Sequence, residues 1–300
     1  MRAFITGGSG FLGRNLRHHL ESMGDEVVIG DRTSTGLDIT NRHGVMHAFE
    51  DAKPDVVYHL AAQSHVPTAW DDPVSTIRCN VEGTLNVLDA ADLAGVQRLV
   101  IASSAAVYGS IAAAELPVDE STEARPNNPY AASKLAAEAL TMQSFHGRGQ
   151  DVIRLRVFNS VGPGQRPDFV CSGIARRIAD AERANRSEIR VGRLDVRRDF
   201  SDVRDVVRAY RLAAVAGVPG AVYNVCSGTD RSVEEIAVGL AQHSTHEVNF
   251  VVDADHLRPA DTPVVRGNAA ALNAATGWRP EIPFETTLKD VLDDARGLSQ

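Results

Sequence analysis

Short apolar runs alternate with segments of helical periodicity through the first half of the chain. The runs lie at residues 2–6, 26–31, 55–62, 97–104 and 151–158. Between them, apolar residues recur at the spacing of one helix face, over about residues 11–22, 41–52, 73–94 and 128–147. Continuous apolar strands separated by helices indicate a parallel sheet covered on both faces. The pattern therefore predicts an α/β fold.

The second half is less regular. Residues 198–214 read as a short strand followed by a helix, and residues 221–227 as another strand. Ser232 and Glu235 have the spacing of a capping box and predict the start of a helix. The segments 161–167 and 258–263 are rich in Pro and Gly and are expected to be loops.

Composition and charge narrow the classes of protein that fit. Hydrophobic residues make up 43% of the 300 and charged residues 23%, which is typical of a globular protein. The net charge of −8 argues against a nucleic-acid partner, because phosphate binding needs clustered basic surface. No apolar run is long enough to span a bilayer, and no leader sequence is visible. Three widely spaced cysteines suit neither a disulfide framework nor a zinc site. We expect a cytoplasmic protein without a membrane partner.

The first candidate site is the glycine-rich turn after the strand at residues 2–6. Gly7, Gly10 and Gly13 have the spacing that permits a tight turn, close approach of a pyrophosphate and close packing of the next helix. Asp31 ends the following strand 18 residues after Gly13, where a carboxylate can hold a ribose diol. Together these features predict a dinucleotide cofactor.

The choice between NAD(H) and NADP(H) stays open in the sequence. Asp31 favours NAD(H), because its charge would repel a 2′-phosphate, whereas the neighbouring Arg32 suits that phosphate. We expect either NAD(H) or NADP(H) as the cofactor.

The second candidate site is the pair Tyr130 and Lys134. The chain holds 31 lysines and arginines, and only three are lysines. Asn128 is placed to cap a helix with Pro129 at its first position, which brings Tyr130 and Lys134 onto one helix face. A nearby ammonium lowers the pKa of a phenol and makes it a usable acid or base. A catalytic tyrosine assisted by a lysine is therefore predicted.

Ser103 and Ser104 end the strand at residues 97–104, where a parallel sheet places ligand-facing residues. The glycine turn, Ser104, and Tyr130 with Lys134 resemble the extended short-chain dehydrogenase/reductase family, and the resemblance covers essentially the whole chain. It implies a doubly wound Rossmann-type sheet with a smaller C-terminal substrate-binding lobe. The implied boundaries are residues 1–160 for the dinucleotide-binding domain, with returning segments at about 196–227, and residues 161–300 mainly for the lobe.

The resemblance also implies the residues of the site. Ser104, Tyr130 and Lys134 are the expected catalytic residues, and no metal is expected. The expected cofactor contacts are Gly7, Gly10, Phe11, Leu12, Gly13, Asp31, Arg32, Asp38, Ile39, Leu60, Ala61, Ala62, Asn80, Tyr130 and Lys134. The expected contacts with a nucleotide-diphosphate sugar are Ser103, Ser104, Asn159, Val170, Arg198, Arg258 and Asp261.

The two residues after Ser104 help to distinguish between the reactions that the family carries out. Dehydratases resembling this chain carry acidic residues where Ala105 and Ala106 stand, and an alanine cannot titrate, so dehydration is disfavoured. The segment also lacks the cysteine used in double epimerisation. The run 103–109 resembles UDP-sugar 4-epimerases, whereas the substrate half resembles reductases of GDP-4-keto-6-deoxy-D-mannose. Reduction of that 4-keto group to GDP-D-rhamnose is the preferred interpretation. The alternatives are a 4-epimerase of the UDP-glucose/UDP-galactose type and a dTDP-4-keto-6-deoxysugar reductase.

Two helices predict self-association. The segments 74–94 and 129–146 carry apolar residues beyond those that one sheet face requires, and the second is rich in alanine. Relatives resembling this chain commonly dimerise by packing two such helices from each subunit about a two-fold axis. We expect a homodimer, and arginine at Ala137 or Leu140 to disrupt it if those side chains face the partner.

Overall fold

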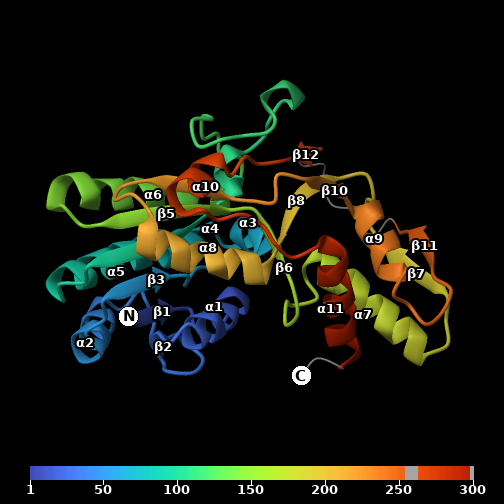
Figure 1. The fold of residues 1–300 in the computed structure, drawn as a ribbon, viewed down its shortest axis with the longest axis horizontal. Helices are drawn as coiled ribbons and strands as arrows, with labels where there is room; N and C mark the ends of the chain where they lie inside the picture. The colour runs from blue at the N-terminus through green and yellow to red at the C-terminus, as the bar shows by residue number, and fades with distance from the viewer. Residues whose placement is uncertain (254–262, 298–300) are drawn as a thin grey trace.

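The main sheet has six parallel strands in the order β2-β1-β3-β4-β5-β9 (Figure 1). The structure is a computed structural model that describes residues 1–253 and 263–297. The predicted α/β fold with a parallel sheet is confirmed. The six strands are β1 (Arg2–Thr6), β2 (Glu26–Gly30), β3 (Val56–His59), β4 (Arg98–Ser104), β5 (Val152–Val157) and β9 (Val222–Val225).

Helices cover both faces of this sheet, and each face has its own core. On one face, α1 and α8 pack around Ile5, Tyr58 and Tyr210. On the other, α2 and α5 pack around Phe4 and Phe49. Burial on both faces explains why the strands are continuously apolar. The helices are α1 (Phe11–Ser22), α2 (Arg42–Ala52), α5 (Gly83–Leu93), α6 (Pro129–Arg148), α8 (Val203–Ala216) and α10 (Ala270–Thr276).

The segment expected to form one helix over residues 73–94 is divided. It follows α3 (Val66–Asp71) and consists of α4 (Pro73–Ile77), a π-helical turn η1 (Arg78–Glu82) and α5. π-helical turns are rare, occur mostly as single turns inside α-helices, and are frequent at functional sites. Periodicity does not reveal this one, because the apolar positions continue through it.

Part of the second half forms a smaller lobe with its own core. The strands β6 (Asn159–Val161), β8 (Arg197–Asp202), β10 (Asp230–Ser232) and β12 (Val264–Val265) form one sheet, and β7 (Glu188–Val191) pairs with β11 (Asn249–Val252). The helices α7 (Val170–Arg183), α9 (Val233–Ala241) and α11 (Phe284–Arg296) pack together beside them. The predicted capping box is confirmed, since Ser232 Oγ accepts from Glu235 N and Glu235 Oε2 from Ser232 N. Within residues 196–227, β9 joins the main sheet and β8 does not.

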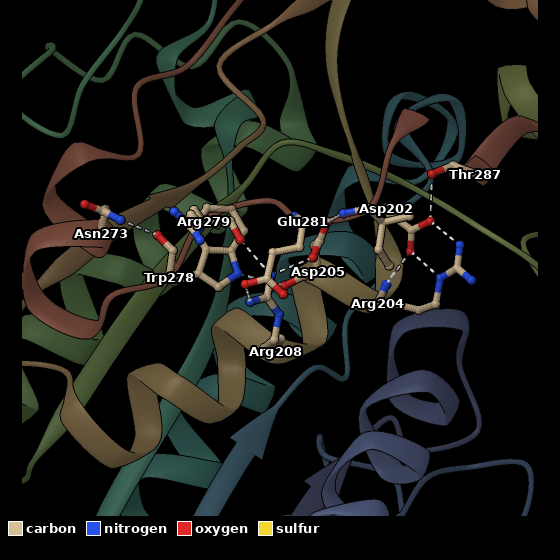
Figure 2. Close-up of polar contacts among 10 residues, drawn as sticks. Asp202, Arg204, Asp205, Arg208, Asn273, Trp278, Arg279, Glu281 and Thr287 are labelled. Carbon is tan, nitrogen blue, oxygen red and sulfur yellow. Dashed lines mark hydrogen bonds and ion pairs between the residues drawn. The ribbon is translucent and has the colours of Figure 1, made fainter. Parts of the chain in front are cut away.

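Hydrogen bonds join helix α8, which packs on the main sheet, to the segment that leads into the second lobe (Figure 2). Asp202, which caps α8, accepts a 2.7 Å hydrogen bond from Thr287 of α11. The buried carboxylate of Asp205 accepts from the main-chain N–H of Glu281, and the Asp205 carbonyl accepts from Trp278 Nε1. These contacts hold the connection between α10 and α11 on α8, so the lobe has a fixed attachment beside the carboxyl ends of the strands. Across the described ranges, no helix combines the length and apolar character needed to cross a membrane.

Candidate active site

The glycine-rich turn joins β1 to α1 and is tightly packed. Gly7 has φ +73°, and a Cβ there would lie 2.8 Å from Ala61 N. A Cβ on Gly13 would lie 2.3 Å from the Gly7 carbonyl oxygen, so only glycine allows α1 to approach the turn this closely. Gly10 is the N-cap of α1, and Phe11 and Leu12 begin its first turn. The N-terminus of a helix is a site for a phosphate, because its first N–H groups have no partner within the helix.

Asp31 lies directly after β2, beside the glycine-rich turn. Its carboxylate accepts hydrogen bonds from the main-chain N–H groups of Ser9, Thr33 and Ser34, each at 2.8 Å, and from Ser34 Oγ at 3.0 Å. Burial opposes the charge, but these hydrogen bonds outweigh it and lower the pKa of Asp31 to about 2. The neighbouring Arg32 is 79% exposed and forms a 3.6 Å ion pair with Asp38. A fixed negative charge therefore stands where the sequence predicts the cofactor ribose.

The other expected cofactor residues follow the ends of β2 and β3. Ala61 N donates to Thr6 Oγ1, and Leu60 N to the Thr6 carbonyl, which holds Leu60, Ala61 and Ala62 against β1. The side chain of Ile39 is buried, and its carbonyl accepts from Asn86 Nδ2. These segments lie at one edge of the sheet, as the carboxyl ends of parallel strands must.

Asn80 connects that edge to the helix of Tyr130. It lies in the π-helical turn, where its Oδ1 accepts from Gln63 N at 2.8 Å and its Nδ2 donates to the Gln63 carbonyl and to Ser133 Oγ at 2.9 Å. Ser133 Oγ donates in turn to the Tyr130 carbonyl. Asn80 is therefore a structural link between the loop after β3 and the start of α6.

The structure places Ser104 beside Tyr130, and Lys134 lies four residues after Tyr130 on α6. Asn128 caps α6 and Pro129 opens it, as predicted. Burial raises the pKa of Tyr130, and a side-chain hydrogen bond with Ser104 offsets part of that rise. Lys134 is 7% exposed, and burial lowers its pKa to about 8.

The expected direction of the tyrosine shift is wrong for this structure. We expected Lys134 to lower the pKa of Tyr130, but the pKa is raised, because removal of the phenol from water disfavours its charged form. The Lys134 ammonium donates instead to the Ala102 carbonyl at 2.8 Å. The hydrogen bond that favours the phenolate comes from Ser104.

The two serines at the end of β4 lie in different surroundings. Ser104 Oγ accepts from Ala106 N and lies beside Tyr130. Ser103, expected to contact the substrate, is buried and donates a 2.5 Å hydrogen bond to Glu138 of α6. The Ser103 hydroxyl is therefore bound by Glu138 inside the protein, and its contact with the substrate stays a prediction.

The other expected substrate residues that the structure describes lie in the second lobe. Asn159, exposed on β6, donates from Nδ2 to the Asp199 carbonyl, and β6 pairs with the β8 strand that carries Arg198. Val170 is exposed at the start of α7. Arg258 and Asp261 lie outside the described residues.

One basic residue near Arg198 was not predicted from the sequence as a site residue. Arg231 of β10 is the register partner of Arg198, so the two side chains share one sheet face. The Arg231 guanidinium lies 4.2 Å from the centroid of the Phe284 ring. Two guanidiniums on one face suit an anionic group, but β10 has only three residues, too few for a periodic signal.

The arrangement can carry out acid–base chemistry beside a bound nicotinamide. A tyrosine and a serine at the carboxyl end of β4 can share a proton with a substrate oxygen, and the helix N-terminus of α1 can hold the diphosphate of the cofactor. Among the described residues, no group of three or more His, Cys, Asp and Glu side chains could hold a metal ion.

Comparison with known proteins agrees with this class of site. The fold and the Ser104, Tyr130 and Lys134 arrangement define an NAD(P)-dependent enzyme fold of the short-chain dehydrogenase/reductase type. Residues 33–291 match the sequence model of the family described as GDP-mannose 4,6 dehydratase. The chain belongs to this family.

Individual relatives match over nearly the whole chain. GDP-6-deoxy-D-mannose reductase of Pseudomonas aeruginosa is 40% identical, over 98% of this chain and 96% of that protein. The structure of RMD from Pseudomonas aeruginosa complexed with NADPH superposes with a TM-score of 0.91 at 38% identity, covering 99% of each chain. UDP-glucose 4-epimerase of Thermus thermophilus in complex with NAD gives a TM-score of 0.88 at 30% identity, again over 99% of each chain.

Proposed function

We propose that this protein reduces the 4-keto group of a nucleotide-activated 6-deoxyhexose with NADH or NADPH, converting GDP-4-keto-6-deoxy-D-mannose to GDP-D-rhamnose. The observation that carries the proposal is the 40% identity, over 98% of the chain, to GDP-6-deoxy-D-mannose reductase of Pseudomonas aeruginosa. The location of Ser104 and Tyr130 at the carboxyl end of β4 supports it.

The residues of the chain have distinct roles in this reaction. The bound nicotinamide supplies a hydride to the ketone carbon. Tyr130 donates the proton to the ketone oxygen, and Ser104 donates a hydrogen bond to the charge that develops there. Lys134, held at the Ala102 carbonyl, contributes positive charge beside the cofactor ribose. Asn80 fixes the start of α6 and so the direction of Tyr130.

The second lobe is proposed to bind the nucleotide sugar. Arg198 supplies positive charge for the diphosphate, and Asn159 and Val170 line the same site, with Arg258 and Asp261 as further expected contacts. The proposed division is residues 1–160 for the cofactor, with returning segments at about 196–227, and mainly residues 161–300 for the substrate. The core that α7, α9 and α11 share supports the division, whereas Leu272 and Trp278 pack in the core of the main sheet.

NADH is the cofactor that the charge around Asp31 favours. The Asp31 carboxylate is kept ionised by four hydrogen bonds and would repel a 2′-phosphate, and the exposed Arg32 lies 3.6 Å from the opposite charge of Asp38. The comparison of kcat/KM for NADH and NADPH with the GDP-4-keto sugar tests both the reaction and this preference.

A 4-epimerase is the second candidate function, favoured by one observation. Ser103–Gly109 resembles UDP-sugar 4-epimerases, and a UDP-glucose 4-epimerase shares the fold at 30% identity. An epimerase returns the hydride to the same carbon, so it uses no net cofactor. Interconversion of UDP-glucose and UDP-galactose without added cofactor would favour this candidate.

The protein is also proposed to act as a homodimer in the cytoplasm. Trp70 near the end of α3, and Val74 and Ile77 on α4, are 62%, 74% and 49% exposed. They lie on α3 and α4, which pack beside α6, where Ala132 and Ala136 are exposed. A second copy of the same face would cover this apolar surface about a two-fold axis.

A further inference from the structure

Three polar side chains form a row across the neighbouring strands β4, β5 and β9, beneath α6. The register pairs Ser103 of β4 with Arg156 of β5, and Arg156 with Asn224 of β9. Residues paired in this way project from the same face of a sheet. Ser103, Arg156 and Asn224 are all buried, in positions where apolar side chains would be expected.

Glu138 of α6 lies directly over this row. Its Oε1 accepts from Ser103 Oγ at 2.5 Å and from Arg156 Nε at 2.9 Å, and its Oε2 accepts from Arg156 Nη2 at 2.8 Å. The Arg156 guanidinium thus binds the carboxylate with two hydrogen bonds, the geometry that fixes both position and orientation. Glu138 is 3% exposed, so it does not touch a substrate.

Hydrogen bonds also connect this row of side chains to the segment of the chain between Ser104 and Tyr130. Arg156 Nη1 donates to Tyr108 Oη at 3.2 Å, and Tyr108 donates to Asn224 Oδ1 at 2.7 Å. Asn224 Nδ2 donates to the carbonyls of Val118 and Asn268. The network therefore connects α6 with the chain between Ser104 and Tyr130.

We propose that Glu138, held by Arg156, is a positioning residue that sets the separation of Ser104 on β4 from Tyr130 and Lys134 on α6. The inference rests on the proposed reductase function.

The sequence positions of the network explain how it would act. Ser103 precedes Ser104, and Glu138 follows Lys134 by four residues and Tyr130 by eight, which places all three on one side of α6. The contact between Ser103 and Glu138 therefore joins the two elements that carry the reacting groups, next to those groups on each element. Buried ion pairs add little stability over apolar replacements, whereas small errors in placement lower catalytic rates strongly.

The first test removes one contact with a small change. Ser103→Ala deletes the hydroxyl that donates to Glu138 and leaves the ion pair with Arg156 intact. We expect kcat to fall by about tenfold or more, with KM for the sugar and Kd for the cofactor within about twofold of the parent enzyme. Ser144→Ala is the matched control, since Ser144 is also buried on α6 but bonds to Gln150 at the far end of the helix. An unchanged kcat in Ser103→Ala, or an equal fall in Ser144→Ala, overturns the inference.

A structural readout separates this inference from the proposed function. A parent enzyme that fails to reduce the GDP-4-keto sugar contradicts the function, and the positioning role is then judged by crystal structures alone. We expect Ser103→Ala to show Ser104 displaced relative to Tyr130, and Ser144→Ala to show no displacement. Identical separations of Ser104 Oγ and Tyr130 Oη in all three proteins contradict the positioning role.

Discussion

Lys134 Nζ donates a 2.8 Å hydrogen bond to the carbonyl of Ala102, two residues before Ser104 on β4. This bond fastens the helix that carries Tyr130 to the strand that carries Ser104. The lysine therefore has a structural partner within the chain as well as its proposed role beside the cofactor ribose. An arginine would not be equivalent there, because its larger planar guanidinium replaces a compact ammonium.

Replacement of Tyr130 tests the proposed proton donor. Tyr130→Phe removes only the hydroxyl, so we expect kcat to fall by at least about 100-fold while cofactor affinity stays nearly unchanged. Steady-state kinetics and cofactor titration measure the two effects. Tyr58→Phe is the matched control, because the buried Tyr58 hydroxyl has no hydrogen-bond partner in the described part of the chain. Near-normal turnover by Tyr130→Phe would show that Tyr130 is not the proton donor.

The activity should depend on the charge of Lys134. Burial lowers its pKa to about 8, so the ammonium is present below pH 8 and is lost as the pH rises through that value, earlier than for an exposed lysine. We expect kcat/KM to decline above about pH 8, as measured with saturating cofactor across the neutral and alkaline range. A profile that stays flat through pH 9 contradicts this role of the charge.

His59 should make the protein sensitive to acid. It is buried between Thr6 Oγ1 at 2.7 Å and Thr84 Oγ1 at 3.0 Å, and burial lowers its pKa to about 3. The unfolded chain therefore binds a proton that the folded chain does not as the pH falls below 6.5. The free energy of unfolding should drop by about 2–3 kcal/mol between pH 6.5 and 4.5 from this group.

Denaturant unfolding of two variants isolates that contribution. His59→Gln should show a shallower fall in the free energy of unfolding over the same pH range. His43→Gln changes an exposed histidine and should keep the slope of the parent protein. Equal slopes in all three proteins would show that His59 does not carry the effect.

Self-association should depend on α4. Ala137, named from the sequence as a disrupting position, is 4% exposed within the subunit, and Leu140 is partly buried against the sheet core, so Val74 is a more accessible position for the test. We expect Val74→Arg to yield monomers in light scattering, because Val74 is 74% exposed on the apolar face. Val218→Arg changes an equally apolar exposed residue after α8 and should remain dimeric. A monomeric parent protein at micromolar concentration would exclude the dimer.

The main sheet was predictable because its strands are buried on both faces. The strand predicted at residues 2–6 matches β1, and the helix predicted at 11–22 matches α1. Tyr130 and Lys134 were placed correctly on one helix because Asn128 and Pro129 mark its start. These signals are local, so they can be read from spacing alone.

Long-range contacts could not be read in the same way. The side chain of Ser103 is directed by Glu138, which lies 35 residues later, and Arg231 meets Arg198 only through the pairing of β10 with β8. The raised pKa of Tyr130 reflects burial by the fold, which an i,i+4 pairing does not reveal. Arg258 and Asp261 remain predictions outside the described residues.

The reductase proposal is tested most directly by the stoichiometry of cofactor and sugar. The purified protein is incubated with GDP-4-keto-6-deoxy-D-mannose and NADH or NADPH, while the absorbance of the reduced nicotinamide is followed and the product is identified by NMR. We expect one reduced cofactor to be consumed for each GDP-D-rhamnose formed. Interconversion of UDP-glucose and UDP-galactose, with no net consumption of cofactor and no reduction of the GDP-4-keto sugar, would contradict it.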